Sequence, residues 1–365
     1  MPDLQSIEDH LVRQILSRRA FEQHGSGKVS RQELAPFLNE IAAISRSYVT
    51  HSVGAALSSP IESVRSAESY ALYYTPINAA KVLHLTPMMS LPESELRVLD
   101  VGSGPGTAGL ALLASLCNSI NLTCVEHSPP MRTVAERVLS KFSGRGTLTK
   151  LTMLHSLPPE SPDTFDLIIA ANVLAELDSG RGENLIVSLA RRLSPAGHLM
   201  VIEPGQQRHT RQLMRLRDIV LSSERSLAPV FPCLRSDECP MLKASESDWC
   251  HGTIEWAQPR LSAHLDDLLS FNKHRIKYSA FLFQQNGRVK DGVRVLTPPE
   301  KNRLGTEALV CGKDTYGVVR IRKGQRSESN RPFEKADTFE RLRLSEPCPR
   351  EIAEHVVVTS MPDTP

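Results

Sequence analysis

The segment between Leu96 and Gly205 constrains the fold most, because short apolar runs alternate there with stretches of helical periodicity. Such alternation is typical of a mostly parallel sheet whose strands are connected by helices. We predict strands in the runs RVLDV, LTCVE, FDLIIA and GHLMVIE, at residues 97–101, 122–126, 165–170 and 197–203. The sequence therefore predicts an α/β fold.

A glycine-rich loop follows the first of these strands, in the sequence VLDVGSGPGT at residues 98–107. Because glycine has no Cβ, Gly102, Gly104 and Gly106 allow the backbone to approach a ligand closely. Glu126 ends the next strand, where a carboxylate can accept hydrogen bonds from the two ribose hydroxyls of an adenosine cofactor. A glycine turn alone can serve packing, but the strand, the glycines, the helix and the acid together indicate a nucleotide pocket.

The spacing of these glycines, G-x-G-x-G led by Asp100, differs from the dinucleotide fingerprint. It resembles motif I of class I methyltransferases that use S-adenosylmethionine. FDLIIAANVLAEL (165–177) resembles their fourth strand and its loop, and LSPAGHLMVIEPG (193–205) resembles their fifth strand. This resemblance implies a Rossmann-like methyltransferase sheet, with Asp100, the glycines and Glu126 at S-adenosylmethionine.

Asn172 follows the fourth predicted strand and is a further candidate for the cofactor site. A loop asparagine more often caps a turn, and we rank that role first. The loop reads Ala171-Asn172-Val173, without the (Asp/Asn)-Pro-Pro-aromatic signature of nucleic-acid amino methyltransferases. A base-amine reaction is therefore unsupported, and the catalytic residues stay unknown.

Three of the seven cysteines lie in FPCLRSDECPMLKASESDWCH at 231–251, and a fourth follows in ALVCGKDTYGVV. The four are Cys233, Cys239, Cys250 and Cys311. Clustered thiols in a reducing compartment more often bind metal than form disulfides. Four thiolates suit either Zn²⁺ or a [4Fe–4S] cluster, and spacing alone favours zinc because zinc sites are commoner. The other cysteines, interpreted as inert thiols, are Cys117, Cys124 and Cys348.

The P-C-x5-C-P stretch, followed by D-W-C-H, a K-Y-S strand and a late cysteine, resembles one family. It is the family of methyltransferase-like assembly factors of the mitochondrial small ribosomal subunit, with their bacterial relatives. The helix QLMRLRDIV after Glu203-Pro204-Gly205 fits the same family. The resemblance covers most of residues 70–325. It implies a [4Fe–4S] cluster with the four clustered cysteines as ligands, and the small ribosomal subunit or its RNA as partner.

Charge is distributed unevenly along the chain. Residues 205–330 hold 21 basic and 14 acidic side chains, a net charge of +7, whereas residues 1–204 hold 17 basic and 20 acidic ones, a net charge of −3. A basic segment is most often a solvated surface. The alternative is a face for the phosphate backbone of RNA. The basic residues that flank the cysteines are Arg208, Arg211, Arg215, Arg217, Lys273, Arg275 and Lys277.

Composition and the N-terminal segment limit the remaining possibilities. No apolar run has the length that spans a bilayer. The start, MPDLQSIEDHL, carries three acids and no apolar stretch, so we expect neither a secretory signal nor a mitochondrial presequence, and a cytoplasmic protein of bacterial type.

We expect four regions in the chain. Residues 1–92 are predicted to form a helical N-terminal extension, and residues 93–290 the methyltransferase-like domain with a cysteine-rich insertion at 228–260. Residues 291–330 are predicted to be β-rich and to supply the fourth cysteine. For residues 331–365 we expect a polar, partly disordered tail.

The function that the sequence favours is an S-adenosylmethionine-dependent methyltransferase that acts on or with small-subunit ribosomal RNA in ribosome assembly and translation. One alternative is an RNA-binding assembly factor without catalytic activity. The other is a small-molecule methyltransferase whose metal site is only structural.

Overall fold

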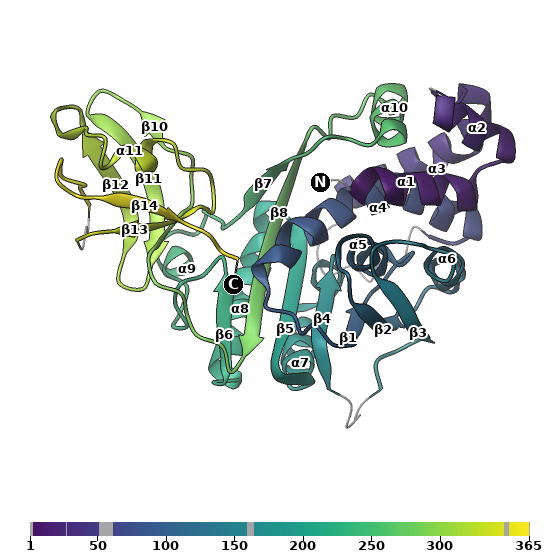
Figure 1. Ribbon diagram of the computed structural model, residues 1–365, viewed down its shortest axis with the longest axis horizontal. Helices are drawn as coiled ribbons and strands as arrows, with labels where there is room; N and C mark the ends of the chain where they lie inside the picture. Colours follow the sequence, from purple (N-terminus) through teal and green to yellow (C-terminus); the bar gives the residue numbers. More distant parts are fainter. Residues whose placement is uncertain (1–2, 27, 51–60, 159–163, 347–349, 365) are drawn as a thin grey trace. The chain divides into compact units, whose positions relative to one another are not determined.

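The computed structural model describes residues 3–26, 28–50, 61–158, 164–346 and 350–364, and Figure 1 shows their helices and strands. The chain divides into two compact units, each assembled from separate segments. The first unit consists of Met1–Pro87, Leu91–Asp178 and Ile254–Ile276. The second consists of Met88–Ser90, Ser179–Thr253 and Lys277–Pro365. These divisions differ from the expected boundaries at residues 92 and 290.

In the first unit, helices surround a parallel sheet. The helices are α1 (Asp3–Ile15), α2 (Arg18–Ser26), α3 (Arg31–Thr50), α4 (Val64–Leu85), α5 (Thr107–Ser115), α6 (Pro129–Leu139) and α10 (Arg260–Leu269). The short 3-10 turns are η1 (Thr86–Met88), which runs into the second unit, and η2 (Leu174–Glu176). Helix α4 packs against α1, α5 and α6. The N-terminal helices thus belong to the same unit as the first four strands and do not form a separate extension.

Local sequence explains where α4 begins. The Ser63 side chain accepts a hydrogen bond from the Ser66 backbone N–H, and the Ser66 side chain accepts one from the Ser63 backbone N–H. Such a reciprocal pair satisfies donors that a helix leaves unpaired at its N-terminus. Most residues of α4 are buried, so this helix forms part of the core of its unit.

The four strands of the first unit are β1 (Leu96–Val101), β2 (Ser119–Val125), β3 (Thr147–Leu154) and β4 (Phe165–Ala171). They lie in the order β3-β2-β1-β4, and β1 pairs in parallel with both β2 and β4. Parallel strands bring their carboxyl ends to one edge of the sheet. The loops after β1, β2 and β4 therefore meet at that edge, which is where the predicted cofactor residues lie.

The second unit holds antiparallel strands. Its first part contains α7 (Ser179–Ala190), β5 (Leu193–Pro204), α8 (Gln207–Ser223), β6 (Leu227–Phe231), α9 (Pro240–Ala244), β7 (Gly252–Glu255) and β8 (Arg275–Gln285), the last two of which cross the boundary between the units. Strand β8 lies between β5 and β6 and is antiparallel to both. The predicted α/β fold is confirmed, and its strands are of both parallel and antiparallel kinds.

A second sheet occupies the C-terminal part of the chain. It contains β9 (Val293–Val295), β10 (Glu300–Lys301), β11 (Gly305–Gly312), β12 (Tyr316–Arg322), β13 (Arg341–Leu344) and β14 (Val358–Met361), with η3 (Lys323–Gln325) and α11 (Arg331–Glu334). The strand order is β10-β11-β9-β13-β14, and β12 pairs with β11.

The expectation of a disordered tail after residue 331 was wrong for the described residues. Strand β13 pairs with both β9 and β14. Phe333, Leu342 and Val358 are buried in the same core as Val295 and Ile321. Burial of these apolar side chains offsets the entropy cost of ordering a polar segment. Cys348 lies outside the described residues.

Candidate functional site

The loop after β1 turns sharply at its glycines. Gly102, Gly104 and Gly106 have φ values of +65°, +52° and +84°, in the left-handed region that favours glycine. The N–H groups of Gly102 and Ser103 both donate to the carbonyl oxygen of Val125, at 2.7 and 3.1 Å. These bonds fix the start of the loop against the end of β2.

The three glycines have different surroundings. A Cβ at Gly102 would lie 2.2 Å from Cγ2 of Val173, and one at Gly106 would lie 2.8 Å from side-chain atoms of Leu139. A Cβ at Gly104 would meet no atom within 4 Å. Packing therefore explains glycine at the two outer positions, whereas the space beside Gly104 is open to a ligand.

Glu126 lies directly beside this open position. Its Oε2 accepts a hydrogen bond from the Gly104 N–H at 2.9 Å, and its Oε1 accepts one from the Ser128 N–H at 2.8 Å. The residue is 6 % exposed. Because each carboxylate oxygen can accept more than one bond, Glu126 is oriented by the backbone and retains capacity for further donors.

Asp100 lies at the end of β1 and is 2 % exposed. Its Oδ2 has no hydrogen-bond partner among the described residues. Burial, and secondarily repulsion from Glu126, raises the pKa of Asp100 to about 7. An acid in this state is a candidate contact for a ligand that donates a hydrogen bond or carries positive charge.

Asn172 follows β4 and has a φ of +59°. Asparagine tolerates this left-handed conformation better than most residues do. The turn places Val173 against Gly102, so the loop after β4 packs directly on the glycine loop. This geometry agrees with the turn role that the sequence analysis ranked first. A contact between Asn172 and a cofactor stays a prediction.

Sequence reasoning missed several side chains near the glycine loop. Burial, and then repulsion from Glu126, raises the pKa of Glu176 in η2. Burial, and then the charge of Glu176, also raises the pKa of Tyr70 on α4. The Tyr70 and Tyr74 rings stack with centroids 4.9 Å apart. The four-residue spacing of these two tyrosines is the signal that could have placed them on one face of a helix.

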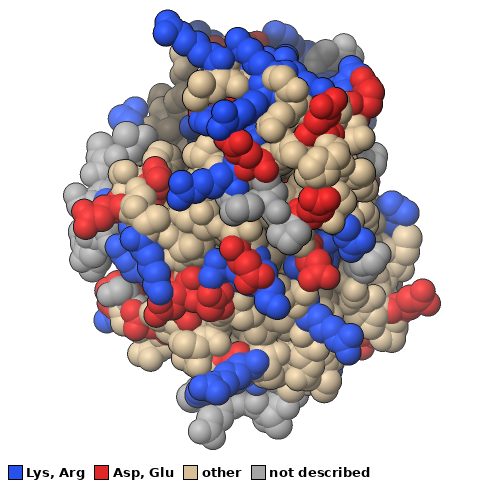
Figure 2. All heavy atoms as spheres, turned by 90° about the vertical axis from the view of Figure 1, so that its left-hand side faces the viewer, with Lys and Arg blue, Asp and Glu red and all other residues tan. Residues whose placement is uncertain are grey.

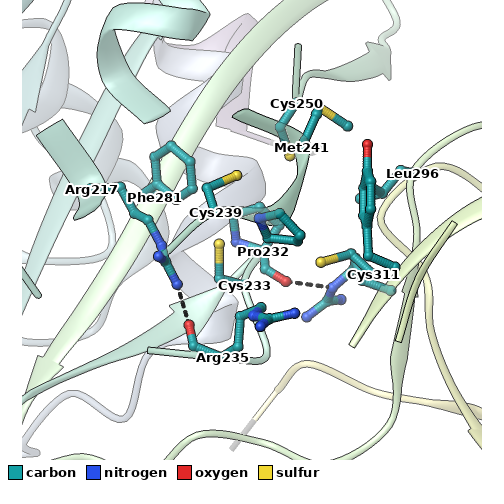
Figure 3. Close-up of a pocket in the computed structure, with 13 residues that line it drawn as sticks. Arg217, Pro232, Cys233, Arg235, Cys239, Met241, Cys250, Phe281, Leu296 and Cys311 are labelled. Atoms are coloured by element: carbon teal, nitrogen blue, oxygen red, sulfur yellow. Dashed lines mark hydrogen bonds between the residues drawn. The ribbon is translucent and has the colours of Figure 1, made fainter. Parts of the chain in front are cut away.

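The four clustered cysteines line one pocket within the second unit, as Figure 3 shows. Cys233 follows β6, Cys239 precedes α9, Cys250 precedes β7 and Cys311 lies in β11. Sequence reasoning thus selected thiols that the fold brings together from 78 residues of separation (311 minus 233). Of the remaining thiols that the structure describes, Cys117 is exposed and Cys124 is buried, and neither lines this pocket.

The thiols of the pocket influence one another electrostatically. Burial, and then repulsion from Cys233 and Cys239, raises the pKa of Cys311 to about 12. The pKa of Cys250 is raised by burial and by the other three thiols. A metal ligand must lose its proton, so a cation in the pocket would have to compensate for this repulsion.

The side chains of the pocket are not arranged around a single ion. Among the residues that the structure describes, no group of three or more His, Cys, Asp or Glu side chains is placed to hold one metal ion. The cysteine-rich insertion therefore stands as a thiol-lined pocket, and its cofactor belongs to the proposals below.

The basic residues expected to form one face have different environments. Arg217 is only 1 % exposed and lines the cysteine pocket, so its place on a surface was wrong. Arg211 donates to the backbone carbonyl oxygens of Ser245 and Asp248, at 2.9 and 2.6 Å, and thereby holds the loop before Cys250. The basic side chains of the second unit that are exposed are Arg208, Arg215 and Lys277.

Other basic residues of this region are paired with acids. Arg275 pairs with Glu255 at 2.8 Å in the first unit, where Lys273 is also exposed. On the C-terminal sheet, Arg322 pairs with Glu351 at 2.6 Å. Figure 2 shows Lys and Arg interspersed with Asp and Glu on the face that it presents. The net charge of +7 therefore overstates the basic charge available to a partner.

Comparison with known proteins identifies the family. A family model described as "Mitochondrial small ribosomal subunit Rsm22" matches residues 40–337. The chain belongs to the Rsm22 family. This membership confirms the family that the sequence resembled, and the family description names the small ribosomal subunit. No curated protein matches the chain by sequence. None of the described helices is both long and apolar enough to cross a membrane.

Solved structures that share part of the fold with this Rsm22 family member are methyltransferases. One is the N-methyltransferase NodS from Bradyrhizobium japonicum WM9 in complex with S-adenosyl-L-homocysteine, with 15 % identity, a TM-score of 0.36, and coverage of 58 % of this chain and 89 % of that chain. A putative RNA methyltransferase from Pyrococcus horikoshii has 16 % identity, a TM-score of 0.34, and coverage of 57 % and 85 %. Magnesium protoporphyrin IX methyltransferase from Synechocystis PCC 6803, with bound S-adenosylmethionine, has 13 % identity, a TM-score of 0.33, and coverage of 66 % and 88 %.

Proposed function

We propose that this member of the Rsm22 family binds S-adenosylmethionine at its glycine loop and acts on or with the RNA of the small ribosomal subunit. The observation that carries the cofactor is the open space beside Gly104, next to the buried Glu126 carboxylate. The ribosomal partner is inferred from the family description.

The residues around the open position fit the proposed cofactor. Glu126, held by two backbone N–H groups, would accept hydrogen bonds from the ribose hydroxyls. Asp100, whose Oδ2 has no partner among the described residues, would receive a donor or the positive charge of the sulfonium side of the molecule. S-adenosylmethionine supplies an electrophilic methyl group when bound. The contribution of the protein is to orient that group toward its acceptor and to exclude water.

For the second unit, we propose a [4Fe–4S] cluster with Cys233, Cys239, Cys250 and Cys311 as ligands. Zinc binds four sulfurs at about 2.3 Å, which puts neighbouring sulfurs about 3.8 Å apart in a tetrahedron. The four thiols share one pocket, but no three of the metal-binding side chains described are arranged around a single ion. A pocket of this kind favours a cluster, whose four irons each take one thiolate, over one zinc ion. The cluster would hold the loop between β6 and α9 to strand β11.

The cofactor proposal is tested by calorimetry with the full chain. Gly104→Arg fills the open position and should abolish binding of S-adenosylmethionine. Gly25→Arg is a matched control, since a Cβ at Gly25 also meets nothing within 4 Å but lies in α2. If the unaltered chain binds neither S-adenosylmethionine nor its demethylated product, the assignment of the loop is wrong.

The cluster proposal is tested by protein purified without oxygen. It should be brown and contain about four irons per chain, as expected for a thiolate-held [4Fe–4S] cluster. Replacing Cys233 or Cys311 by Ser should lose the iron, whereas Cys117→Ser and Cys124→Ser should retain it, because those two thiols do not line the pocket. A colourless chain with one bound zinc would exclude the cluster and restore the zinc interpretation.

A further inference from the structure

Two adjacent side chains of α8 hold the loop that connects Cys233 to Cys239. The Arg217 guanidinium donates hydrogen bonds to the backbone carbonyl oxygens of Arg235 and Asp237, both within this loop. The Asp218 carboxylate accepts the backbone N–H of Cys239, at 3.1 and 3.0 Å to its two oxygens. The loop is therefore fixed at three backbone positions by one turn of a helix.

Arg217 is itself fixed by its neighbour. Its Nη1 lies 2.5 Å from Oδ1 of Asp218, and the side chain is 1 % exposed. Burial of a guanidinium is costly unless it is paired and hydrogen-bonded, and both conditions hold for the two terminal nitrogens. The cost of burying this arginine is thus met by contacts with the cysteine loop.

One donor of Arg217 remains without a partner. Its Nε is buried and makes no hydrogen bond to any described residue. Arg217 also lines the pocket that the four thiols share, and Figure 3 shows it beside Cys233 and Cys239. An unpaired buried N–H costs about 1–3 kcal/mol, so this donor needs an acceptor that the side chains alone do not supply. Thiolate and sulfide sulfurs are acceptors of the kind that a cluster in this pocket would bring.

Similar contacts hold the other walls of the pocket. Arg294 is 1 % exposed and donates to the carbonyl oxygens of Pro232 at 2.8 Å and Phe339 at 2.6 Å. Its guanidinium pairs with Asp363, which also accepts from Arg341 at 3.1 Å. The residue before Cys233 is thereby tied to β9 and to the C-terminal segment.

We propose that Arg217 is a positioning residue of the four-cysteine site: it fixes the Cys233–Cys239 loop before a cluster binds, and its free Nε–H donates a hydrogen bond to a sulfur of the bound cluster. The inference rests on the proposed [4Fe–4S] site. Hydrogen bonds to the sulfurs of a cluster favour its reduced state, because they stabilise the added negative charge. Arg217 therefore makes the cluster easier to reduce, in addition to shaping its pocket.

The test compares Arg217→Lys with Arg215→Lys in the full chain. Lysine keeps the charge but lacks Nε and the planar fork that spans two carbonyl groups. Arg215 lies on the same helix and is exposed, so its replacement controls for the loss of an arginine from α8. Each apo protein is reconstituted with iron and sulfide without oxygen. The rate of cluster uptake is followed by absorbance, and the midpoint potential is measured by titration with dithionite, a one-electron reductant of the cluster.

We expect Arg217→Lys to take up the cluster several-fold more slowly and to shift its midpoint potential to a more negative value, while Arg215→Lys matches the unaltered chain. Equal uptake rates and equal potentials for the two variants would overturn the inference. Absence of iron from the unaltered, anaerobically prepared chain would instead contradict the cluster itself, and the proposed sulfur acceptor with it.

A second variant decides the matter if Arg217→Lys does not fold. Asp218→Ala removes the acceptor of the Cys239 N–H from a partly exposed position and leaves Arg217 in place. Slower cluster uptake by this variant, with its secondary structure intact by circular dichroism, supports a loop fixed by α8. Uptake at the rate of the unaltered chain shows that the loop needs no such support and refutes the positioning role.

Discussion

Asp100→Asn tests the electrostatics of the cofactor edge, because this carboxyl is buried beside Glu126. Its pKa rises from 3.8 to about 7 on folding. A raised pKa means that the folded state holds the proton more tightly than the unfolded state does. Stability contributed by the protonated acid is therefore complete below about pH 4 and is lost as the pH rises through about 7.

The size of the effect follows from the shift. About three pKa units at 1.36 kcal/mol each give about 4 kcal/mol of unfolding free energy, lost from the unaltered chain between pH 4 and pH 8. Asparagine does not ionise, so Asp100→Asn should lack this part of the pH dependence. Other buried groups titrate equally in both proteins, and the difference between the two curves isolates Asp100.

The measurement is urea unfolding of both ligand-free proteins at several pH values from 4.5 to 8. Asp267→Asn is the control, since Asp267 is exposed in a surface ion pair with Lys28. We expect the Asp100→Asn variant to gain stability relative to the unaltered chain as the pH rises, by up to about 4 kcal/mol. A constant difference across this pH range would refute the buried, repelled carboxyl.

Three further predictions concern other parts of the chain. Gly102→Ala should destabilise the first unit by about 1–3 kcal/mol, because its Cβ would lie 2.2 Å from Val173 and its φ is +65°; urea unfolding measures the loss, and Gly102→Ala with Val173→Ala should recover the steric part. The metal-free chain should lose stability as the pH rises above about 9, because burial and neighbouring thiols raise the pKa of Cys311 to about 12 and the folded state resists its ionisation; thermal melting at pH 8 and pH 10 checks this, and equal melting temperatures would contradict it. Reversing the exposed basic charges of α8 and β8 should weaken binding to small-subunit RNA and flatten its dependence on salt by about 0.7–0.9 per lost phosphate contact in a plot of log K against log salt, whereas an unchanged slope would place the RNA elsewhere. The residues to be replaced together by Glu are Arg208, Arg215 and Lys277.

Features that depend on short stretches of sequence could be predicted. The apolar strands and the glycine loop follow from local pattern, and β1, β2 and β4 occur where that pattern placed them. The outcome for the cysteines is similar, because the residue type itself identified the four thiols that share the pocket. No local pattern distinguishes Gly104, beside open space, from Gly102, which packs on Val173. That distinction depends on a loop 71 residues later in the chain (173 minus 102).

Features that depend on distant partners could not be predicted. Arg217 was assigned to a basic surface because arginine is usually exposed, yet carbonyl groups of a later loop bury it. The polar segment after residue 331 was expected to be disordered, but its strand β13 pairs with β9, where Arg341 lies opposite Arg294, 47 residues earlier (341 minus 294). In both cases the decisive contacts are hydrogen bonds between segments that carry no mutual signal in the sequence.

Crosslinking of the protein to RNA in living cells, followed by sequencing of the bound RNA, tests the proposed ribosomal function most directly. We predict strong enrichment of small-subunit ribosomal RNA over all other RNA classes. Loss of the enrichment is expected when the exposed basic residues of α8 and β8 are replaced, and its retention is expected in Gly104→Arg, which alters only the cofactor pocket. Bound RNA with the composition of total cellular RNA would contradict the proposed partner.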